Sequence, residues 1–265
     1  MVHLMDTTRS FSIVEGAFYS LNWVHKLTDL PNPIDHYLPV LIKEAAKRKL
    51  GRPCDRKDPI STATMSRIIA KYAGSDSLID FRFLTMCVLA FSGFLRFNDL
   101  INLKLSDFLF HEDHLKITIR KSKTDVYSIG QTVILAKTDS VGCPVKTLSK
   151  YFSLAKLNFA KDCDLFVFRS IVGKGRKAKL SPRNVPLSYS RSRELLKSYL
   201  KSFNLNPNSF GLHSFRIGGA TAAARNGVSH SSIKAHGRWK TDSAKDLYVR
   251  RNSAEQMLVS KSLNL

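Results

Sequence analysis

Apolar side chains recur three and four positions apart over most of the chain, which is the spacing of an amphipathic helix. Near the start of the sequence this pattern covers residues 11–29 and 35–50. The segment Leu30-Pro31-Asn32-Pro33 lies between them, and proline ends a helix because it has no backbone N–H to donate. The sequence therefore predicts a small helical domain in residues 1–52.

A charged, proline-bounded segment, residues 53–59, follows and predicts a linker. The rest of the chain, residues 60–265, is expected to form a larger domain. Its predicted helices are residues 61–72, 76–93, 143–158 and 191–203. The second of these helices is apolar on nearly every side, so we expect it in the core.

Three short stretches of the larger domain run apolar or alternate apolar with polar, and they are rich in β-branched residues. They are residues 108–110, 114–120 and 131–135. Such stretches predict antiparallel strands joined by tight turns. Leu165–Phe168 predicts one further brief strand. The expected fold class is therefore mainly α with a small antiparallel β-sheet, an α+β fold.

The charge balance changes the expected partner. Lys and Arg outnumber Asp and Glu by 42 to 21, which gives a formal net charge of +21. A chain this basic repels itself without a polyanionic partner, so a nucleic acid is favoured over small acidic ligands. Ribosomal and other RNA-binding proteins share this balance. The charge therefore indicates a class of partner and not an activity.

The sequence does not indicate secretion, a membrane span or a metal site. The first twenty residues lack the apolar region of a signal peptide. The longest apolar run, residues 83–95, is shorter than the roughly 20 residues that cross a bilayer. The four cysteines show no C-x-x-C spacing and are interpreted as reduced thiols. His111 and His114 lack a ligand pattern around them, so we expect an intracellular protein without a metal.

The residues that could bind a ligand or react are most concentrated in residues 212–250. His213 and Arg216 are three residues apart, so a helix would place both side chains on one face. The helix is expected to begin near His213 and to end at Gly227. Free backbone N–H groups and the positive end of the helix dipole favour an anion in its first turn. This pair is therefore a candidate phosphate site.

The remainder of that stretch brings a candidate nucleophile toward the same face. We expect a short helix at residues 231–235 and a third helix that carries Tyr248. The turns between these helices could return Trp239 and Tyr248 to the phosphate site. A tyrosine hydroxyl beside a phosphate is a candidate for covalent catalysis.

The order of these residues resembles a known family. H-x-x-R beginning at His213, G-x-W beginning at Gly237 and a tyrosine nine residues beyond Trp239 are similar to the C-terminal half of the tyrosine recombinase (phage integrase) family. The resemblance covers residues 60–250, and residues 11–52 more weakly. It implies a tyrosine recombinase catalytic domain preceded by a partial helical core-binding domain. The GRW form is similar to a eukaryotic mobile-element branch.

The resemblance also implies an upstream arginine and a hairpin lysine. The segment GFLRFNDL resembles the first arginine box of the family, with Arg96 aimed at the scissile phosphate and Asp99 as its support. Taken alone, Arg96 is also typical of a solvated cation that ends an apolar helix. In the segment RKSKTD, Lys123 best matches the family's β-hairpin lysine, and Lys121 is the alternative.

The implied activity is that of a site-specific DNA recombinase or integrase that forms a 3′-phosphotyrosyl intermediate. The tyrosine attacks phosphorus, the two arginines clamp the non-bridging oxygens, and the lysine protonates the leaving 5′-oxygen. The histidine accepts the tyrosyl proton or binds the phosphate, and the tryptophan donates a hydrogen bond or packs the site. No cofactor, metal or ATP is required, because the phosphotyrosyl link preserves bond energy. The implied catalytic residues are Arg96, Lys123, His213, Arg216, Trp239 and Tyr248.

Double-stranded DNA is the implied partner. The loop GKGRKAK, residues 173–179, offers four cations to a phosphate backbone. It is not a P-loop, because G-x-x-x-x-G-K-[ST] is absent. A nuclear localisation patch and a merely solvated loop are the alternatives. The candidate DNA-binding residues are Lys121, Lys174, Arg176, Lys177, Lys179 and Arg238.

The C-terminal stretch, residues 253–265, predicts a short apolar helix. It could dock on a neighbouring subunit, as in the homo-tetramers that the family forms on paired DNA sites, or pack on its own domain. Two other activities fit the same residues: DNA relaxation like that of a type IB topoisomerase, and a non-catalytic DNA-binding relic of a mobile element. The expected location is the nucleus in a eukaryote, and otherwise the cytoplasm or nucleoid.

Overall fold

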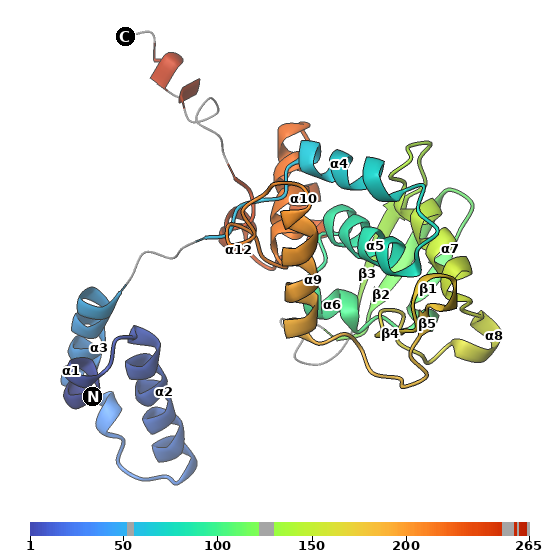
Figure 1. Ribbon diagram of the computed structural model, residues 1–265. Helices are drawn as coiled ribbons and strands as arrows, with labels where there is room; N and C mark the ends of the chain where they lie inside the picture. The colour runs from blue at the N-terminus through green and yellow to red at the C-terminus, as the bar shows by residue number, and fades with distance from the viewer. Residues whose placement is uncertain (52–55, 122–129, 251–256, 259, 264–265) are drawn as a thin grey trace. The chain divides into compact units, whose positions relative to one another are not determined.

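The computed structural model describes residues 1–51, 56–121, 130–250, 257–258 and 260–263 (Figure 1). The chain divides into two compact units, Met1–Arg56 and Lys57–Leu265. The boundary between them falls in the segment for which the sequence predicts a linker. The predicted C-terminal helix in residues 253–265 lies largely outside the described residues.

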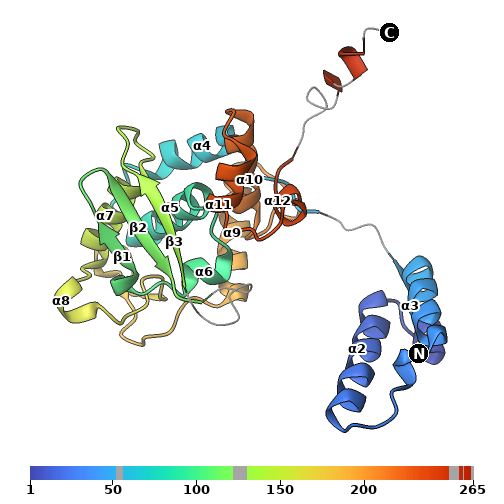
Figure 2. The same ribbon diagram turned by 180° about the vertical axis from the view of Figure 1, so that it is seen from behind.

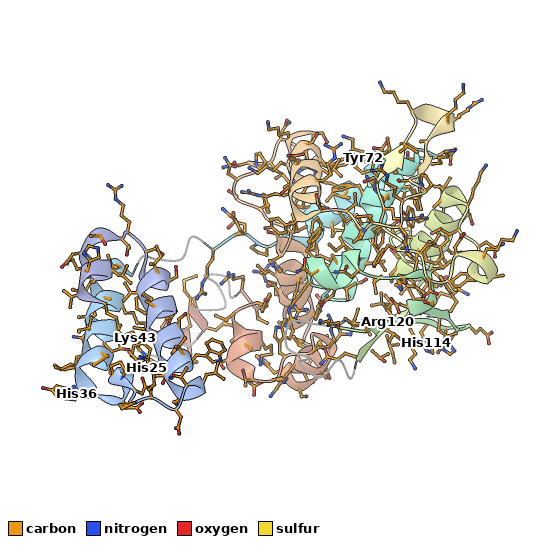
Figure 3. The ribbon with its side chains drawn as sticks, turned by 90° about the horizontal axis from the view of Figure 1, so that it is seen from below. His25, His36, Lys43, Tyr72, His114 and Arg120 are labelled. Carbon is orange, nitrogen blue, oxygen red and sulfur yellow. The ribbon has the colours of Figure 1, made fainter. Side chains whose placement is uncertain are left out.

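The first unit contains three short stretches of α-helix and one turn of 3-10 helix in its described part. They are α1 Val2–Thr7, α2 Phe11–Leu27, η1 Pro33–Asp35 and α3 Tyr37–Leu50. Both helices predicted for this region are confirmed, and α1 is additional. The Asn32 side chain accepts a hydrogen bond from the Ile34 backbone N–H, which begins the turn between α2 and α3. The Lys43 ammonium lies 4.5 Å from the centre of the Phe18 ring (Figure 3).

The second unit is built mainly of helices. They are α4 Thr62–Tyr72, α5 Leu78–Ser92, α6 Phe97–Ile101, α7 Pro144–Ala155, α8 Phe159–Asp162, α9 Tyr189–Lys201, α10 Ser214–Arg225, α11 His230–His236 and α12 Asp242–Asp246. Helix α5 is the centre, because most of its side chains are buried and both α7 and α10 pack against it (Figure 1). The Ser77 side chain accepts a hydrogen bond from the Asp80 backbone N–H and so caps its beginning.

A three-stranded antiparallel sheet packs beside α5 and α7. Its strands are β1 Phe108–Phe110, β2 His114–Ile119 and β3 Gln131–Ala136, in the order β1-β2-β3 (Figures 1 and 2). In β2 the side chains of Leu115, Ile117 and Ile119 are buried and those between them are partly exposed. This alternation places one face of the strand in the core. The three strands predicted from the sequence are confirmed.

The predicted strand at Leu165–Phe168 is wrong. Phe166 makes only an isolated bridge with Lys104, and the nearby two-stranded sheet consists of β4 Ile171–Val172 and β5 Lys179–Leu180, joined by η3 Gly175–Lys177. The consecutive side chains Val167 and Phe168 are both completely buried. The apolar run therefore reflects burial in the core and not the two-residue period of a half-exposed strand.

The predicted fold class is confirmed, because helices dominate and the sheets are small and antiparallel. Among the described residues, Cys87, Cys143 and Cys163 are free thiols. No helix in those same ranges has both the length and the apolar character that crossing a membrane demands. A short 3-10 turn, η2 Leu105–Asp107, leads into β1.

Candidate active site

Two glycines allow α10 to lie close to the backbone before α4 and to the end of α5. A Cβ atom added at Gly218 would lie 2.0 Å from the Ile60 carbonyl oxygen, and one added at Gly219 would lie 2.1 Å from the Phe91 carbonyl oxygen. Any larger residue at either position would force the backbones apart. This approach places Arg216, in the first turn of α10, beside the chain that leaves α5.

The Arg216 side chain is fully buried and is held by backbone oxygens. Its guanidinium donates hydrogen bonds to the carbonyl oxygen of Phe94 and, at 2.6 Å, to that of Gly237. Burial, followed by the positive charges of Arg96 and Arg238, lowers the pKa of Arg216 to about 9. The site therefore concentrates positive charge where water is excluded.

Two aromatic rings cover this guanidinium. The Arg216 guanidinium carbon lies 4.4 Å from the centre of the Trp239 ring and 5.0 Å from that of Tyr248. The two ring centres are 5.1 Å apart. A Cβ atom at Gly237 would lie 1.8 Å from the indole, so only glycine leaves room for Trp239 in this position. Arg216 has no exposed surface in this structure, and both rings lie against its guanidinium.

Tyr248 lies in a turn and not in a helix, which corrects the sequence prediction. Helix α12 ends at Asp246. The Thr221 hydroxyl of α10 then donates to the Tyr248 carbonyl oxygen at 3.2 Å and accepts from the Arg250 backbone N–H at 3.0 Å. The helix stops because these backbone groups bond to Thr221. The third predicted helix therefore exists but leaves Tyr248 beyond its end.

Arg96 and Asp99 begin α6, immediately after the left-handed residue Phe94. One oxygen of Asp99, Oδ2, accepts a hydrogen bond from the Arg96 backbone N–H at 3.3 Å and lies 3.9 Å from the Arg96 guanidinium. The Asp99 side chain is 2% exposed and that of Arg96 is 13% exposed. The aspartate thus caps α6 and lies beside the arginine, and its role as a support for Arg96 stays a prediction.

Arg96 faces a cavity of about 630 Å³. The cavity is also lined by His213 at the start of α10 and by Arg120 and Lys121 at the end of β2. Arg120 is held there by hydrogen bonds to Asp107 and, at 2.9 Å, to the Ser106 hydroxyl (Figure 3). Three cationic side chains and a histidine, together with the carboxylates of Asp99 and Asp107, therefore line a space large enough for a phosphodiester.

The structure describes five of the six candidate catalytic residues, in two groups. Arg216, Trp239 and Tyr248 are in contact, whereas Arg96 and His213 line the cavity, and the charge of Arg96 acts on Arg216. Lys123 lies outside the described residues. Its alternative, Lys121, is described and lines the cavity.

The candidate DNA contacts lie in two different environments. The four cations of the 173–179 loop are exposed on the β4–η3–β5 turn. Arg238, in contrast, is buried, and its guanidinium bonds to backbone oxygens of Gly93, Phe94 and His236. It was expected to face DNA, and its position beside Asp99 is incompatible with that role in this conformation.

Sequence reasoning missed the residues that shape the site without reacting. Phe94 supplies a carbonyl to Arg216, and Thr221 fixes the backbone of Tyr248. Both are ordinary residues in the sequence, and only the packing of α10 on α5 reveals them. In the described ranges, three or more His, Cys, Asp or Glu side chains nowhere gather in a group that could hold a metal ion.

Comparison with known proteins places these residues in a family. The sequence model described as the phage integrase family matches residues 60–255. The chain is 24% identical over 212 residues to an integrase/recombinase, a XerD homologue, of Selenomonas ruminantium. That alignment covers 79% of this chain and 58% of the relative, so the chain spans less than two thirds of that protein.

Solved structures share the fold. XerH recombinase in a post-cleavage complex with difH DNA has a TM-score of 0.58 at 12% identity, covering 79% of this chain and 54% of that one. XerA recombinase has a TM-score of 0.56 at 19% identity, covering 95% and 84%. The Tn1549 transposon integrase in complex with circular intermediate DNA has a TM-score of 0.59 at 14% identity, covering 98% and 81%. Because the family match extends over most of the chain and over the whole cluster of arginines, tryptophan and tyrosine, this protein belongs to the phage integrase family of tyrosine recombinases.

Proposed function

We propose that this protein breaks and rejoins DNA at specific sites through a 3′-phosphotyrosyl intermediate on Tyr248. The observation that carries the proposal is the contact of the Arg216 guanidinium with the rings of both Trp239 and Tyr248, at 4.4 and 5.0 Å. A nucleophile beside a buried cation is what phosphoryl transfer needs, because the attacking oxygen and the growing phosphate charge are both negative.

Four buried donor atoms at this site have no acceptor among the described residues: Nη1 of Arg96, Nε of Arg238, Nε of Arg216 and Nε1 of Trp239. The last two belong to side chains that are in contact. Buried N–H groups are nearly always hydrogen-bonded, so an unpaired pair side by side favours a ligand with acceptor oxygens. A phosphate that enters when the rings shift would satisfy both. Arg96, which faces the cavity, would hold a second non-bridging oxygen.

The reaction conserves atoms and bonds. The Tyr248 oxygen loses its proton, forms a bond to phosphorus, and the bond from phosphorus to the 5′-oxygen breaks. His213 accepts the tyrosyl proton or binds the phosphate, and Lys123 or Lys121 gives a proton to the 5′-oxygen. Attack by another 5′-hydroxyl reverses these steps. The arginines supply the charge stabilisation, so the proposal requires neither a metal nor ATP.

Double-stranded DNA is the proposed partner inside the cell. The net charge of +21 favours a polyanion, and the exposed cations of the 173–179 loop are placed to neutralise backbone phosphates. We extend the proposal to a homo-tetramer on paired DNA sites, docked through residues 253–265. The mass of the protein–DNA complex in native mass spectrometry tests that extension.

The test is covalent capture of DNA. The full chain is incubated, with EDTA and without nucleotide, with a pool of nicked duplexes of randomised sequence whose short fragment is released on cleavage. We expect a denaturant-resistant protein–DNA adduct with the wild type, none with Tyr248→Phe, and an undiminished yield with Tyr19→Phe, which changes an exposed tyrosine of α2.

Each other outcome identifies an alternative. A wild-type protein that binds the pool without forming an adduct would be a non-catalytic relic. An adduct together with relaxation of supercoiled plasmid by the monomer would indicate a topoisomerase-like activity. An adduct that persists in Tyr248→Phe would show that the nucleophile is a different residue.

A further inference from the structure

Arg238 occupies an unusual place for an arginine. Its side chain is 4% exposed, and its backbone has a φ of +56°, a left-handed conformation in which glycine or asparagine is usual. A long charged side chain is the least expected residue in such a buried turn. Its presence therefore requires an interaction that the guanidinium itself makes.

The guanidinium caps the end of α5. The last carbonyl groups of a helix have no partner within it and carry partial negative charge. Here His236 Nε2 donates to the Ser92 carbonyl oxygen at 2.8 Å, and Arg238 donates to those of Gly93 and Phe94 at 3.2 and 3.1 Å. Burial lowers the pKa of His236, so the imidazole acts there as a neutral donor. The segment before Trp239 thus closes the helix from which the Arg96 turn departs.

Arg238 also shares its acceptors with both phosphate-binding arginines. The Phe94 carbonyl oxygen accepts from Arg238 and from Arg216. Oδ2 of Asp99 lies 3.7 Å from the Arg238 guanidinium and 3.9 Å from that of Arg96. Each of the two arginines expected to bind phosphate therefore has one partner in common with Arg238, a carbonyl oxygen for Arg216 and an ion-paired carboxylate for Arg96.

This sharing sets the charge of the site. Two guanidinium groups lie beside one carboxylate, so Asp99 cannot neutralise Arg96 fully while it also faces Arg238. Without Arg238, Asp99 would pair with Arg96 alone and draw its guanidinium away from the cavity. The Phe94 carbonyl would lose one of two donors, and the turn between α5 and α6 would be held by Arg216 only.

We propose that Arg238 is a positioning residue for strand transfer, which holds the Phe94 carbonyl and the Asp99 carboxylate so that Arg216 and Arg96 are presented to the phosphate, and that it does not contact DNA. The proposal rests on the function proposed above. It assigns a role to the residue inserted between the glycine and the tryptophan of the G-x-W motif.

The test is a double-mutant cycle on the rate of adduct formation at saturating DNA. We expect Arg238→Met to lower that rate by about 10²-fold, the cost of a misplacement of about 1 Å, with the affinity for DNA unchanged. Asp99→Asn should also lower it, and the double variant should cost less than the product of the two single losses, because part of the effect of Arg238 acts through Asp99. Arg193→Met, a change of an exposed arginine on α9, is the matched control.

Several results would overturn the proposal. They are a wild-type rate in Arg238→Met, a loss of DNA affinity with the rate retained, and losses that multiply in the double variant. If Arg238→Met does not fold, the cycle is run with Arg238→Lys, which keeps the charge but cannot reach three acceptors, and the same criteria apply. A wild type that forms no adduct would instead reject the proposed function, and this role with it.

Discussion

Helix α5 is flanked by two systems of buried arginine, and they differ in what surrounds them. Near its beginning, Arg82 donates to the Arg169 carbonyl oxygen at 2.6 Å, and Arg169 donates to that of Ser181 at 2.9 Å. At its end, Arg216 and Arg238 also donate to carbonyl oxygens. Burial lowers the pKa of Arg82, as it does those of Arg216 and Arg238. Burial and carbonyl bonding therefore do not distinguish the two systems.

The space beside each system does distinguish them. Arg82 borders a cavity of about 40 Å³, room for about one water molecule. Arg96, beside Arg216, borders one of about 630 Å³ that His213 and Lys121 also line. Only the second system has aromatic rings over a guanidinium and a carboxylate shared between two cations. We therefore expect the first system to hold the fold together and the second to receive a phosphate.

The largest difference in the rate of adduct formation is expected when arginine is replaced by lysine in each of the two systems. Arg216→Lys should lower the rate of adduct formation by about 10²–10³-fold, because it removes a donor aimed at the transition-state charge. Arg82→Lys should leave that rate, per folded molecule, at the wild-type value. Rates are measured by quenching single turnovers in denaturant. Equal losses at the two positions would refute the distinction.

A methyl group added at Gly237, next to Trp239, should lower both the rate of adduct formation and the stability of the protein. Gly237→Ala places a methyl group 1.8 Å from the indole, so the ring must leave its contact with Arg216. Overpacking of this kind costs about 1–3 kcal/mol of stability. Gly74→Ala, where nothing lies within 4 Å of the new Cβ atom, is the control. Urea unfolding and adduct rates of the two variants are compared, and identical behaviour would mean that the indole position does not matter.

Loss of the structural arginine should be seen in stability alone. Arg82→Met leaves the Arg169 carbonyl oxygen without its donor, at a cost of about 1–3 kcal/mol. For a unit of this size the midpoint of thermal unfolding should fall by about 2–4 °C per kcal/mol. Calorimetry measures the shift. A wild-type melting temperature with a reduced adduct rate would assign Arg82 to the reaction instead.

The smallest effect is expected from the exposed loop. Replacement of Lys174, Arg176, Lys177 and Lys179 by glutamine should make the plot of log Kd against log salt shallower by about 0.9 for each DNA phosphate that the loop no longer neutralises. The maximal adduct rate should not change. Lys161→Gln, on α8, is the control. An unaltered salt slope would show that the loop is solvated and does not touch DNA.

Most of the secondary structure could be predicted from the sequence because it depends on the spacing of apolar residues. Helix α5 and the three strands of the larger sheet follow from that spacing. The structure of Leu165–Phe168 could not be predicted in this way, because an apolar run that is buried on all sides has no periodic pattern. The end of α12 before Tyr248 depends on Thr221, which lies 27 residues earlier in the chain. No local pattern contains that contact.

The same limit applies to the site. The spacing of His213, Arg216, Trp239 and Tyr248 led us to predict which residues react, because that spacing is visible in the order of the residues alone. The burial of Arg238 could not be read in this way. It depends on carbonyl groups at the end of α5, and every residue in the sequence has a carbonyl group.

Identification of the amino acid that carries DNA in the adduct is the most direct test that a single tyrosine beside Arg216 is the nucleophile. The wild-type adduct is digested with nuclease and trypsin, and the modified peptide is sequenced by mass spectrometry. We predict a nucleotide on the peptide Asp246–Arg250, attached to Tyr248 through a 3′-phosphate. A nucleotide attached to any other residue, or through a 5′-phosphate, would contradict this assignment.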